Sequence, residues 1–227
     1  MNKLSNLTFI GTFKKIYLIF FGSLFYHYNF PNELRKMVSQ FHTLLDVGCG
    51  SRSPIKDFSK NMSTVGIDAF QSSIDISKKE NIHNEYFLMN MLDIEKKFKF
   101  KTFECVLLCD ALEHVTFSEG EQLLKKAEAI ASKRVVVFTP NGFISQNPYE
   151  ENPFQIHKSG WTVNDMKKRG YSVIGINGWK PLRSEGAQIR FRPRFLWKNI
   201  SLITQILFAR HFPKTAFQIL CFKNIEN

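Results

Sequence analysis

One stretch of eleven residues constrains the fold of this chain more than any other: LLDVGCGSRSP, from Leu44 to Pro54. An apolar run that predicts a strand over Thr43–Val47 breaks into a turn with two glycines, and Ser53 before Pro54 is typical of the start of a helix. A strand, a glycine turn and a helix in this order place the turn at the carboxyl edge of a parallel sheet. Open α/β sheets bind their ligands at this edge, so the sequence predicts a ligand-binding loop here.

The alternation of strand and helix continues to the end of the chain. Short apolar runs predict seven strands: Thr43–Val47, Ser63–Ile67, Glu85–Met89, Phe103–Cys109, Arg134–Thr139, Ser172–Ile176 and Ala216–Lys223. Between them, helices are predicted near residues 54–61, 72–80, 118–132 and 162–169. We therefore expect an α/β fold with a Rossmann-like, doubly wound, seven-stranded sheet. The sheet should be mostly parallel with an antiparallel last strand, and the fold should add N-terminal helices and a helical insertion before that strand.

The chain divides into a neutral core and two basic flanks. A basic, apolar N-terminal helical cap is expected over residues 1–41 and the main domain over 42–227, with a basic aromatic insertion at about 177–215. Residues 1–41 hold five Lys or Arg and one Glu, and residues 179–227 hold nine and two. Residues 42–178 hold seventeen of each sign, so the net charge of +11 belongs to the flanks. Because the motif-bearing core is neutral, nucleic acid is not expected as a partner.

Both flanks also contain apolar, aromatic runs. The run at 16–26 (IYLIFFGSLFY) is too short to span a bilayer, which takes about 20 residues, and the run at 195–212 (FLWKNISLITQILFARHF) contains charged residues. No small-residue cleavage site follows the first run, which disfavours a secretory signal. The two runs either cap the domain's own core or contact a lipid interface or a lipid-like substrate. We expect a cytoplasmic protein, with peripheral contact at the inner face of a membrane as the alternative.

The four cysteines indicate neither disulfides nor a metal site. Cys49, Cys105, Cys109 and Cys221 form no CxxC pair and show no ligand-like spacing to histidine. We interpret them as reduced thiols. No metal ion is expected to bind.

Two aspartates distinguish the glycine turn from a dinucleotide-binding loop. Asp46 lies near the end of the predicted strand, where a pyrophosphate would lie, whereas a carboxylate there suits a ligand with an ammonium group. Asp68, in GIDAF, ends the next strand, where an acid accepts hydrogen bonds from both ribose hydroxyls. Arg52 and Ser53 stand where the GxGxxG pattern needs its third glycine. These features argue against a nicotinamide dehydrogenase.

Five motifs in the order LLDVGCG, GIDAF, FLMNMLDIE, FECVLLCDALEHV and RVVVFTPNG carry a family resemblance. In this order and spacing they resemble the class I S-adenosylmethionine-dependent methyltransferases, and within them the branch of the ubiquinone- and menaquinone-type enzymes. The resemblance covers residues 42–142 and, more loosely, the chain as far as residue 223. It implies S-adenosylmethionine as the cofactor.

The resemblance also implies which residues contact that cofactor. They are Asp46, Gly48, Gly50, Asp68, Ala69, Phe70, Asn90, Asp93, Cys109 and Asp110. Asp46, Gly48 and Gly50 would hold the methionine part. Asp68 would bind the ribose hydroxyls, and Ala69 and Phe70 would flank the adenine. Asn90 and Asp93 are alternatives for the contact with the adenine amino group. Cys109 and Asp110 would line the methionine side.

Methyl transfer to a hydroxyl or amine also needs a group that removes a proton. A histidine is the first candidate because its pKa lies near neutrality. His114 follows the fourth predicted strand, and His157 lies on the long loop after Asn141, so either is a candidate base. Each also has a structural alternative, a shared pocket role for His114 and a helix cap for His157. A carbon or sulfur acceptor would require neither.

We therefore expect an S-adenosylmethionine-dependent methyltransferase that methylates a small-molecule, glycan or lipid-linked acceptor, most simply on oxygen. Two alternatives stay open. One is an RNA or protein methyltransferase that uses the basic flanks as an electrostatic clamp. The other is a non-catalytic subunit that binds S-adenosylmethionine and contacts a partner through the flanks.

Overall fold

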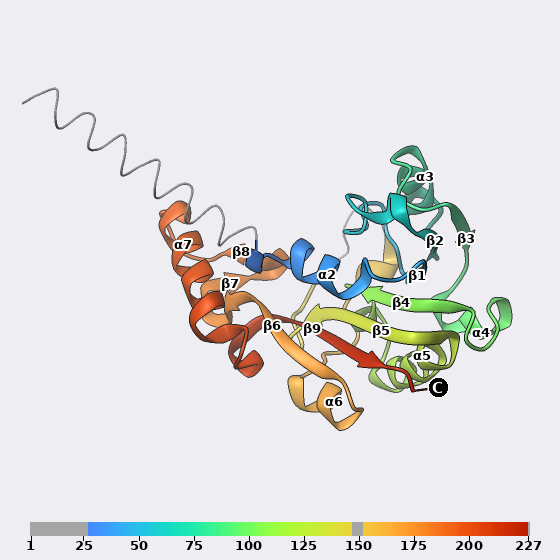
Figure 1. Cartoon of the computed structure of the whole chain (residues 1–227). Helices are drawn as coiled ribbons and strands as arrows, with labels where there is room; N and C mark the ends of the chain where they lie inside the picture. Colours follow the sequence, from blue (N-terminus) through green and yellow to red (C-terminus); the bar gives the residue numbers. More distant parts are fainter. Residues whose placement is uncertain (1–26, 147–151, 227) are drawn as a thin grey trace, which may run out of the picture.

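A seven-stranded sheet forms the centre of the computed structural model, which describes residues 27–146 and 152–226 (Figure 1). Its strands lie in the order β3-β2-β1-β4-β5-β9-β6. Their bounds are β1 Thr43–Val47, β2 Ser63–Asp68, β3 Glu85–Leu88, β4 Phe103–Cys109, β5 Ala131–Pro140, β6 Ser172–Trp179 and β9 Ala216–Asn224. β9 is antiparallel to both of its neighbours, β5 and β6, and the pairings from β3 to β5 are parallel. The predicted Rossmann-like sheet with an antiparallel last strand is confirmed.

Helices and short turns connect the strands. The α-helices of the described residues are α2 Phe30–Val38, α3 Gln71–Lys79, α4 Ile94–Lys97, α5 Phe117–Ile130, α6 Val163–Lys168 and α7 Arg194–Thr204. Short 3₁₀ turns are η1 Ser59–Asn61, η2 Met91–Asp93, η3 Leu112–His114, η4 Pro153–Gln155, η5 Lys180–Leu182, η6 Glu185–Ala187 and η8 Pro213–Thr215. A π-helical turn, η7 Gln205–Ala209, extends α7. A hairpin of β7 (Arg183–Ser184) and β8 (Gln188–Ile189) precedes α7.

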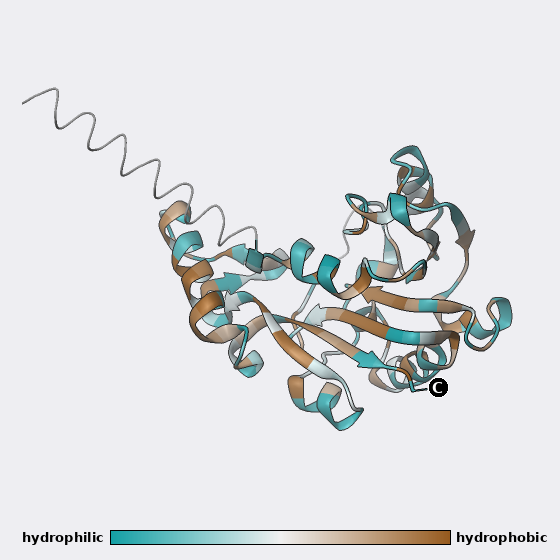
Figure 2. Ribbon diagram, viewed as in Figure 1, coloured by the Kyte–Doolittle hydropathy of each residue, from teal (hydrophilic) through white to brown (hydrophobic). Residues whose placement is uncertain are grey.

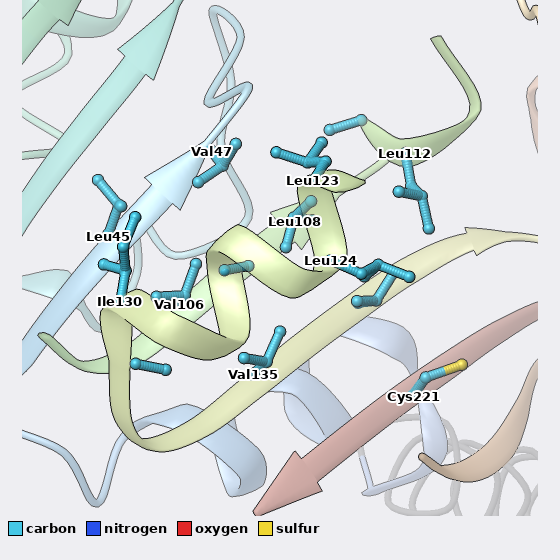
Figure 3. Packing of buried hydrophobic residues seen from close by; sticks show 14 of the residues in the cluster. Leu45, Val47, Val106, Leu108, Leu112, Leu123, Leu124, Ile130, Val135 and Cys221 are labelled. Carbon is cyan, nitrogen blue, oxygen red and sulfur yellow. The ribbon is translucent and has the colours of Figure 1, made fainter. Parts of the chain in front are cut away.

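Figure 2 shows the central strands largely in brown, the colour of hydrophobic residues. Strands of a sheet that is covered on both faces are apolar in this way. Successive side chains point to opposite faces, so each strand contributes to two clusters. On one face, Figure 3 shows side chains of β1, β4 and β5 packed with Leu123, Leu124 and Ile130 of α5. On the other face, Leu34 and Val38 of α2 pack with the alternate residues of the same strands.

The helix predicted near residues 54–61 is wrong. The structure has turns over this segment, followed by the single 3₁₀ turn η1. The Ser53 hydroxyl, expected to cap a helix, donates to Asp46 Oδ2 at 2.6 Å and accepts the N–H of Ile55 at 3.5 Å. The segment buries Ile55 and Ser59 in the core, and its one α-type hydrogen bond, from Ser59 N to Ile55 O at 2.8 Å, does not continue into an α-helix.

The insertion before β9 packs on β6 through two glycines. A Cβ on Gly175 would lie 2.0 Å from the carbonyl oxygen of Ala209, and one on Gly178 would lie 2.3 Å from that of Ser201. The buried Gln205 side chain accepts a hydrogen bond from Gly178 N at 2.7 Å and donates one to Gly175 O at 2.8 Å. The absence of side chains therefore lets α7 and η7 lie directly against the strand.

The insertion also contacts the N-terminal part of the chain. Arg210 forms an ion pair with the buried Glu33 of α2 at 3.2 Å. The apolar run at 16–26 lies outside the described residues. Within residues 27–146 and 152–226, none of the helices has the length and apolar character needed to cross a bilayer.

Candidate functional site

A cavity of about 690 Å³ opens at the carboxyl ends of β1 to β4. Nine of the ten predicted cofactor residues line it: Asp46, Gly48, Gly50, Asp68, Ala69, Phe70, Asn90, Cys109 and Asp110. Asp93 does not line this cavity, and its carboxylate pairs with Lys96 at 2.7 Å. Of the two alternatives for the adenine contact, the structure thus places Asn90 at the cavity.

The loop after β1 takes its shape from two glycines. Gly48 and Gly50 have φ angles of 72° and 58°, in the left-handed region that side chains disfavour. The backbone N–H groups of Gly48 and Cys49 both donate to the carbonyl oxygen of Ile67 at 2.9 Å. A Cβ added at Gly50 would meet nothing within 4 Å, so the loop presents bare backbone to the cavity.

The Asp68 carboxylate joins the loops after β1 and β2. Its Oδ2 accepts the N–H of Gly50 at 2.9 Å, and its Oδ1 accepts the N–H of Phe70 at 2.8 Å. Burial raises the pKa of Asp68, and these two hydrogen bonds oppose that shift. Each carboxylate oxygen keeps a second lone pair, which can accept a hydrogen bond from a ligand hydroxyl in the cavity.

Asp46 places an unpartnered carboxylate oxygen at the wall of the same cavity. Its side chain is 1% exposed, and Oδ2 both accepts the Ser53 hydroxyl and lies 2.9 Å from His83 Nε2. Oδ1 has no hydrogen-bond partner among the described residues. A buried carboxylate oxygen without a donor is unfavourable, and the ammonium group of a bound ligand would supply one. These residues fit a cofactor with an ammonium group and a ribose.

A second cavity of about 390 Å³ adjoins the first. Asp110 and His114 line both cavities, whereas Glu113 and His157 line only the second. Asp110 has a φ of 46°, an unusual backbone conformation for a residue other than glycine. Strain of this kind concentrates at functional sites, and here it lies at the junction of the two cavities.

The structure brings the two candidate bases together. The rings of His114 and His157 lie 5.0 Å apart between centroids. His114 Nδ1 is 3.3 Å from the carbonyl oxygen of Ile156, and His157 Nδ1 is 2.6 Å from that of Ile144. Burial lowers the pKa of His114 to about 4 and also lowers the pKa of His157, so both rings are neutral at pH 7.

Glu113 is a member of this group that sequence reasoning did not select. It is 2% exposed, and the Thr139 hydroxyl donates to its Oε2 at 3.0 Å. Burial, reinforced by the charge of Asp110, raises the pKa of Glu113. Solvent reaches Asp110 inside the cavity, but the dense protein around it still raises the pKa of this carboxyl. The sequence signal was the position of Glu113, beside His114 and directly after a buried strand.

Comparisons with known proteins agree with this geometry. Residues 45–138 match the family model described as a methyltransferase domain. An uncharacterized protein of Methanocaldococcus jannaschii is 25% identical over 138 residues, which cover 59% of this chain and 56% of the relative, so the match spans about half of that protein's length.

Two solved structures show the likeness of fold. A SAM-dependent methyltransferase from Archaeoglobus fulgidus is 14% identical, with a TM-score of 0.57 over 86% of this chain and 92% of that one. The plantazolicin methyltransferase BpumL, in complex with SAH, is 13% identical, with a TM-score of 0.50 over 100% of this chain and 92% of that one. The resemblance to the S-adenosylmethionine-dependent methyltransferases is confirmed over residues 45–138, together with S-adenosylmethionine as the cofactor, and the ubiquinone- and menaquinone-type branch stays a prediction.

Proposed function

Because residues 45–138 belong to the methyltransferase-domain family, whose cofactor is S-adenosylmethionine, we propose that this protein transfers the methyl group to a hydroxyl of a small-molecule, glycan or lipid-linked acceptor. The observation that carries the proposal is the second cavity, which shares Asp110 and His114 with the cofactor cavity. An acceptor bound there would approach the methionine side of the cofactor.

In this proposal, different residues of the first cavity contact different parts of the cofactor. The unpartnered Oδ1 of Asp46 accepts the ammonium group, and the Asp68 carboxylate accepts the ribose hydroxyls. Ala69 and Phe70 flank the adenine, and Asn90 contacts its amino group. Gly48, Gly50, Cys109 and Asp110 line the methionine part.

Methyl transfer is an in-line displacement for which the protein mainly provides alignment. The acceptor oxygen forms a bond to the methyl carbon while the bond from that carbon to sulfur breaks, and the sulfonium becomes the neutral thioether of S-adenosylhomocysteine. The hydroxyl proton leaves to solvent. The group of Glu113, His114 and His157 lies where this proton is released, and the two histidines remain the candidates for receiving it first.

The exposed apolar side chains of α7, η7 and the residues just after η7 support an acceptor that is linked to lipid. Phe195 and Leu207 are 72% and 70% exposed, and Phe212 is also exposed. Arg192 and Arg194 precede them in the chain, and large apolar side chains beside basic ones are typical of peripheral contact with an anionic membrane. We place the protein in the cytoplasm at the inner face of such a membrane.

Methyl-labelled S-adenosylmethionine tests the proposed acceptor class. Purified full-length protein is incubated with the label and with separate lipid, polar small-molecule, glycan, RNA and protein fractions of a cell extract. We expect label in one of the first three, in a product that mass spectrometry finds one methylene heavier. Label confined to RNA or protein would contradict the proposal. A protein that binds the cofactor but labels none of the fractions would instead match a non-catalytic subunit.

A further inference from the structure

We propose that Glu113, His114 and His157, which line the second cavity, bind a divalent transition-metal ion. Each of the three offers one ligand atom, and these atoms all lie within 4.8 Å of one another. Two imidazoles and one carboxylate form a donor set that suits first-row ions such as Zn²⁺, Co²⁺, Mn²⁺ or Fe²⁺. Binding of the ion does not depend on the proposed function, whereas its role in methyl transfer rests on that function.

The spacing is close to what coordination requires. Bonds of about 2.0–2.2 Å in a tetrahedral site hold ligand atoms roughly 3.3–3.6 Å apart. Shifts on the order of 1 Å in the three side chains would close the site around an ion. Two of the side chains share the turn η3, so the shift mainly concerns His157 on its loop.

Outer contacts already hold the three side chains in orientations suited to binding. A carbonyl oxygen only accepts, so His114 Nδ1 and His157 Nδ1 carry the hydrogen toward Ile156 O and Ile144 O. With this hydrogen on Nδ1, the His157 ring keeps its lone pair on Nε2, and the His114 ring also interacts with the backbone of Asp110. The Thr139 hydroxyl holds one oxygen of Glu113 in the same way. Metal-binding histidines and carboxylates characteristically have such partners.

The loop that carries His157 is tied to the turn that carries Glu113. The N–H groups of Lys158 and Ser159 donate to the backbone oxygen of Glu113 at 2.8 and 3.1 Å. Trp161, fully buried, donates through Nε1 to the Ser159 hydroxyl at 3.0 Å. His157 is therefore held beside His114 by the protein itself, as a preformed ligand set requires.

A second carboxyl group lies beside the proposed ligands. Asp110 neighbours Glu113, and neither forms an ion pair with a Lys, Arg or His within residues 27–146 and 152–226. A dication bound by Glu113 would therefore also interact favourably with the Asp110 carboxyl group.

Three protein ligands leave coordination positions free, and the second cavity lies beside them. An acceptor hydroxyl that filled such a position would lose its proton to solvent more readily, because a bound metal ion lowers the pKa of an oxygen ligand. The inferred acceptor class is therefore one whose hydroxyl oxygen can bind a metal ion directly.

Binding of Co²⁺ alone tests the site. Full-length protein is stripped with a chelator and titrated with Co²⁺, followed by visible absorption and calorimetry. We expect one strongly bound ion per chain, displaced by Zn²⁺. Glu113→Gln and His157→Gln should each weaken binding by at least about tenfold, since even the outer partners of metal ligands contribute about 10–100-fold. His42→Gln removes an exposed imidazole outside the group and should leave the affinity unchanged.

Two further measurements separate the possible failures. Circular dichroism and S-adenosylmethionine binding report whether each variant is folded. If stripped protein that binds S-adenosylmethionine takes up no Co²⁺, or if both variants bind it as the wild type does, the metal site is wrong. If Co²⁺ binds as expected and no hydroxyl acceptor is methylated, the proposed function fails and the metal site stands.

Discussion

Asp46 shows how one side chain organises the glycine loop after β1. The same carboxylate oxygen holds Ser53 across the glycine turn and His83 from the loop before β3, which leaves the other oxygen free at the cavity wall. The two held partners fix the orientation of the carboxylate before any ligand binds. Preorganisation of this kind lowers the entropy lost on binding.

Asp68 should contribute to cofactor affinity in two ways. Asp68→Ala removes the acceptor for the ribose hydroxyls and also frees the N–H groups of Gly50 and Phe70. We expect S-adenosylmethionine binding to weaken by about 1–3 kcal/mol, which is roughly 5–150-fold. Calorimetry on folded protein measures this, with the exposed Asp57→Ala as the control. Equal affinities for the two variants would remove Asp68 from the site.

At the scale of elements, α5 begins directly after the turn that carries Glu113 and His114. Its N-terminus has a capping box, in which Thr116 Oγ1 accepts the N–H of Glu119 at 3.4 Å and Glu119 Oε2 accepts the N–H of Thr116 at 2.9 Å. The buried face of the helix packs on the sheet through Leu123 and Leu124. The cap therefore fixes the residue at which the turn ends and α5 begins.

Thr116→Ala should lower the free energy of unfolding by about 1 kcal/mol, because the helix loses its cap. Thr116→Ser keeps the hydroxyl and should stay within a few tenths of the wild-type value, roughly 0.3 kcal/mol. Urea unfolding of both variants gives the comparison. The same loss in both would show that the methyl group of Thr116, rather than the hydrogen bond, stabilises this end of the helix.

Across the whole molecule, the two flanks of the chain meet. Arg210, near the end of the insertion, pairs with Glu33 of α2, so parts from the two ends of the sequence share a contact beside β6 and β9. α7 lies at one end of the molecule in Figure 1, on the far side of β6 from β1 and β2. The exposed apolar residues of α7 and η7 are therefore available without covering the first cavity.

Vesicle sedimentation tests whether this end of the molecule contacts lipid. Phe195→Glu combined with Leu207→Glu removes two exposed apolar side chains and adds negative charge. We expect binding to vesicles with an anionic phospholipid to fall by at least about tenfold, since burial of each side chain contributes about 1.5–3 kcal/mol. Phe100→Glu, at a residue exposed to a similar extent, should bind as the wild type does. Wild-type protein that stays in the supernatant would contradict the proposed membrane contact.

The sequence predicted the sheet well because its signals are local. The strands Thr43–Val47 and Phe103–Cys109 have the predicted bounds, and the glycine or aspartate that follows each apolar run marks the carboxyl end of the strand. The glycine turn and Asp68 likewise indicated the cofactor edge. Their positions follow from the order of strands, which places consecutive carboxyl ends along one side.

Tertiary structure decided what local signals left open. Ser53 looked like a helix cap, and its hydroxyl does accept the N–H of Ile55, but it also ties the segment to Asp46 and no α-helix follows it. The sequence by itself determined the fold and the methyl donor, because strand periodicity and the glycine loop lie within short segments. Only the folded chain brought His157 from its distant loop to Glu113 and His114, since backbone hydrogen bonds between loop and turn, and not sequence spacing, set that distance.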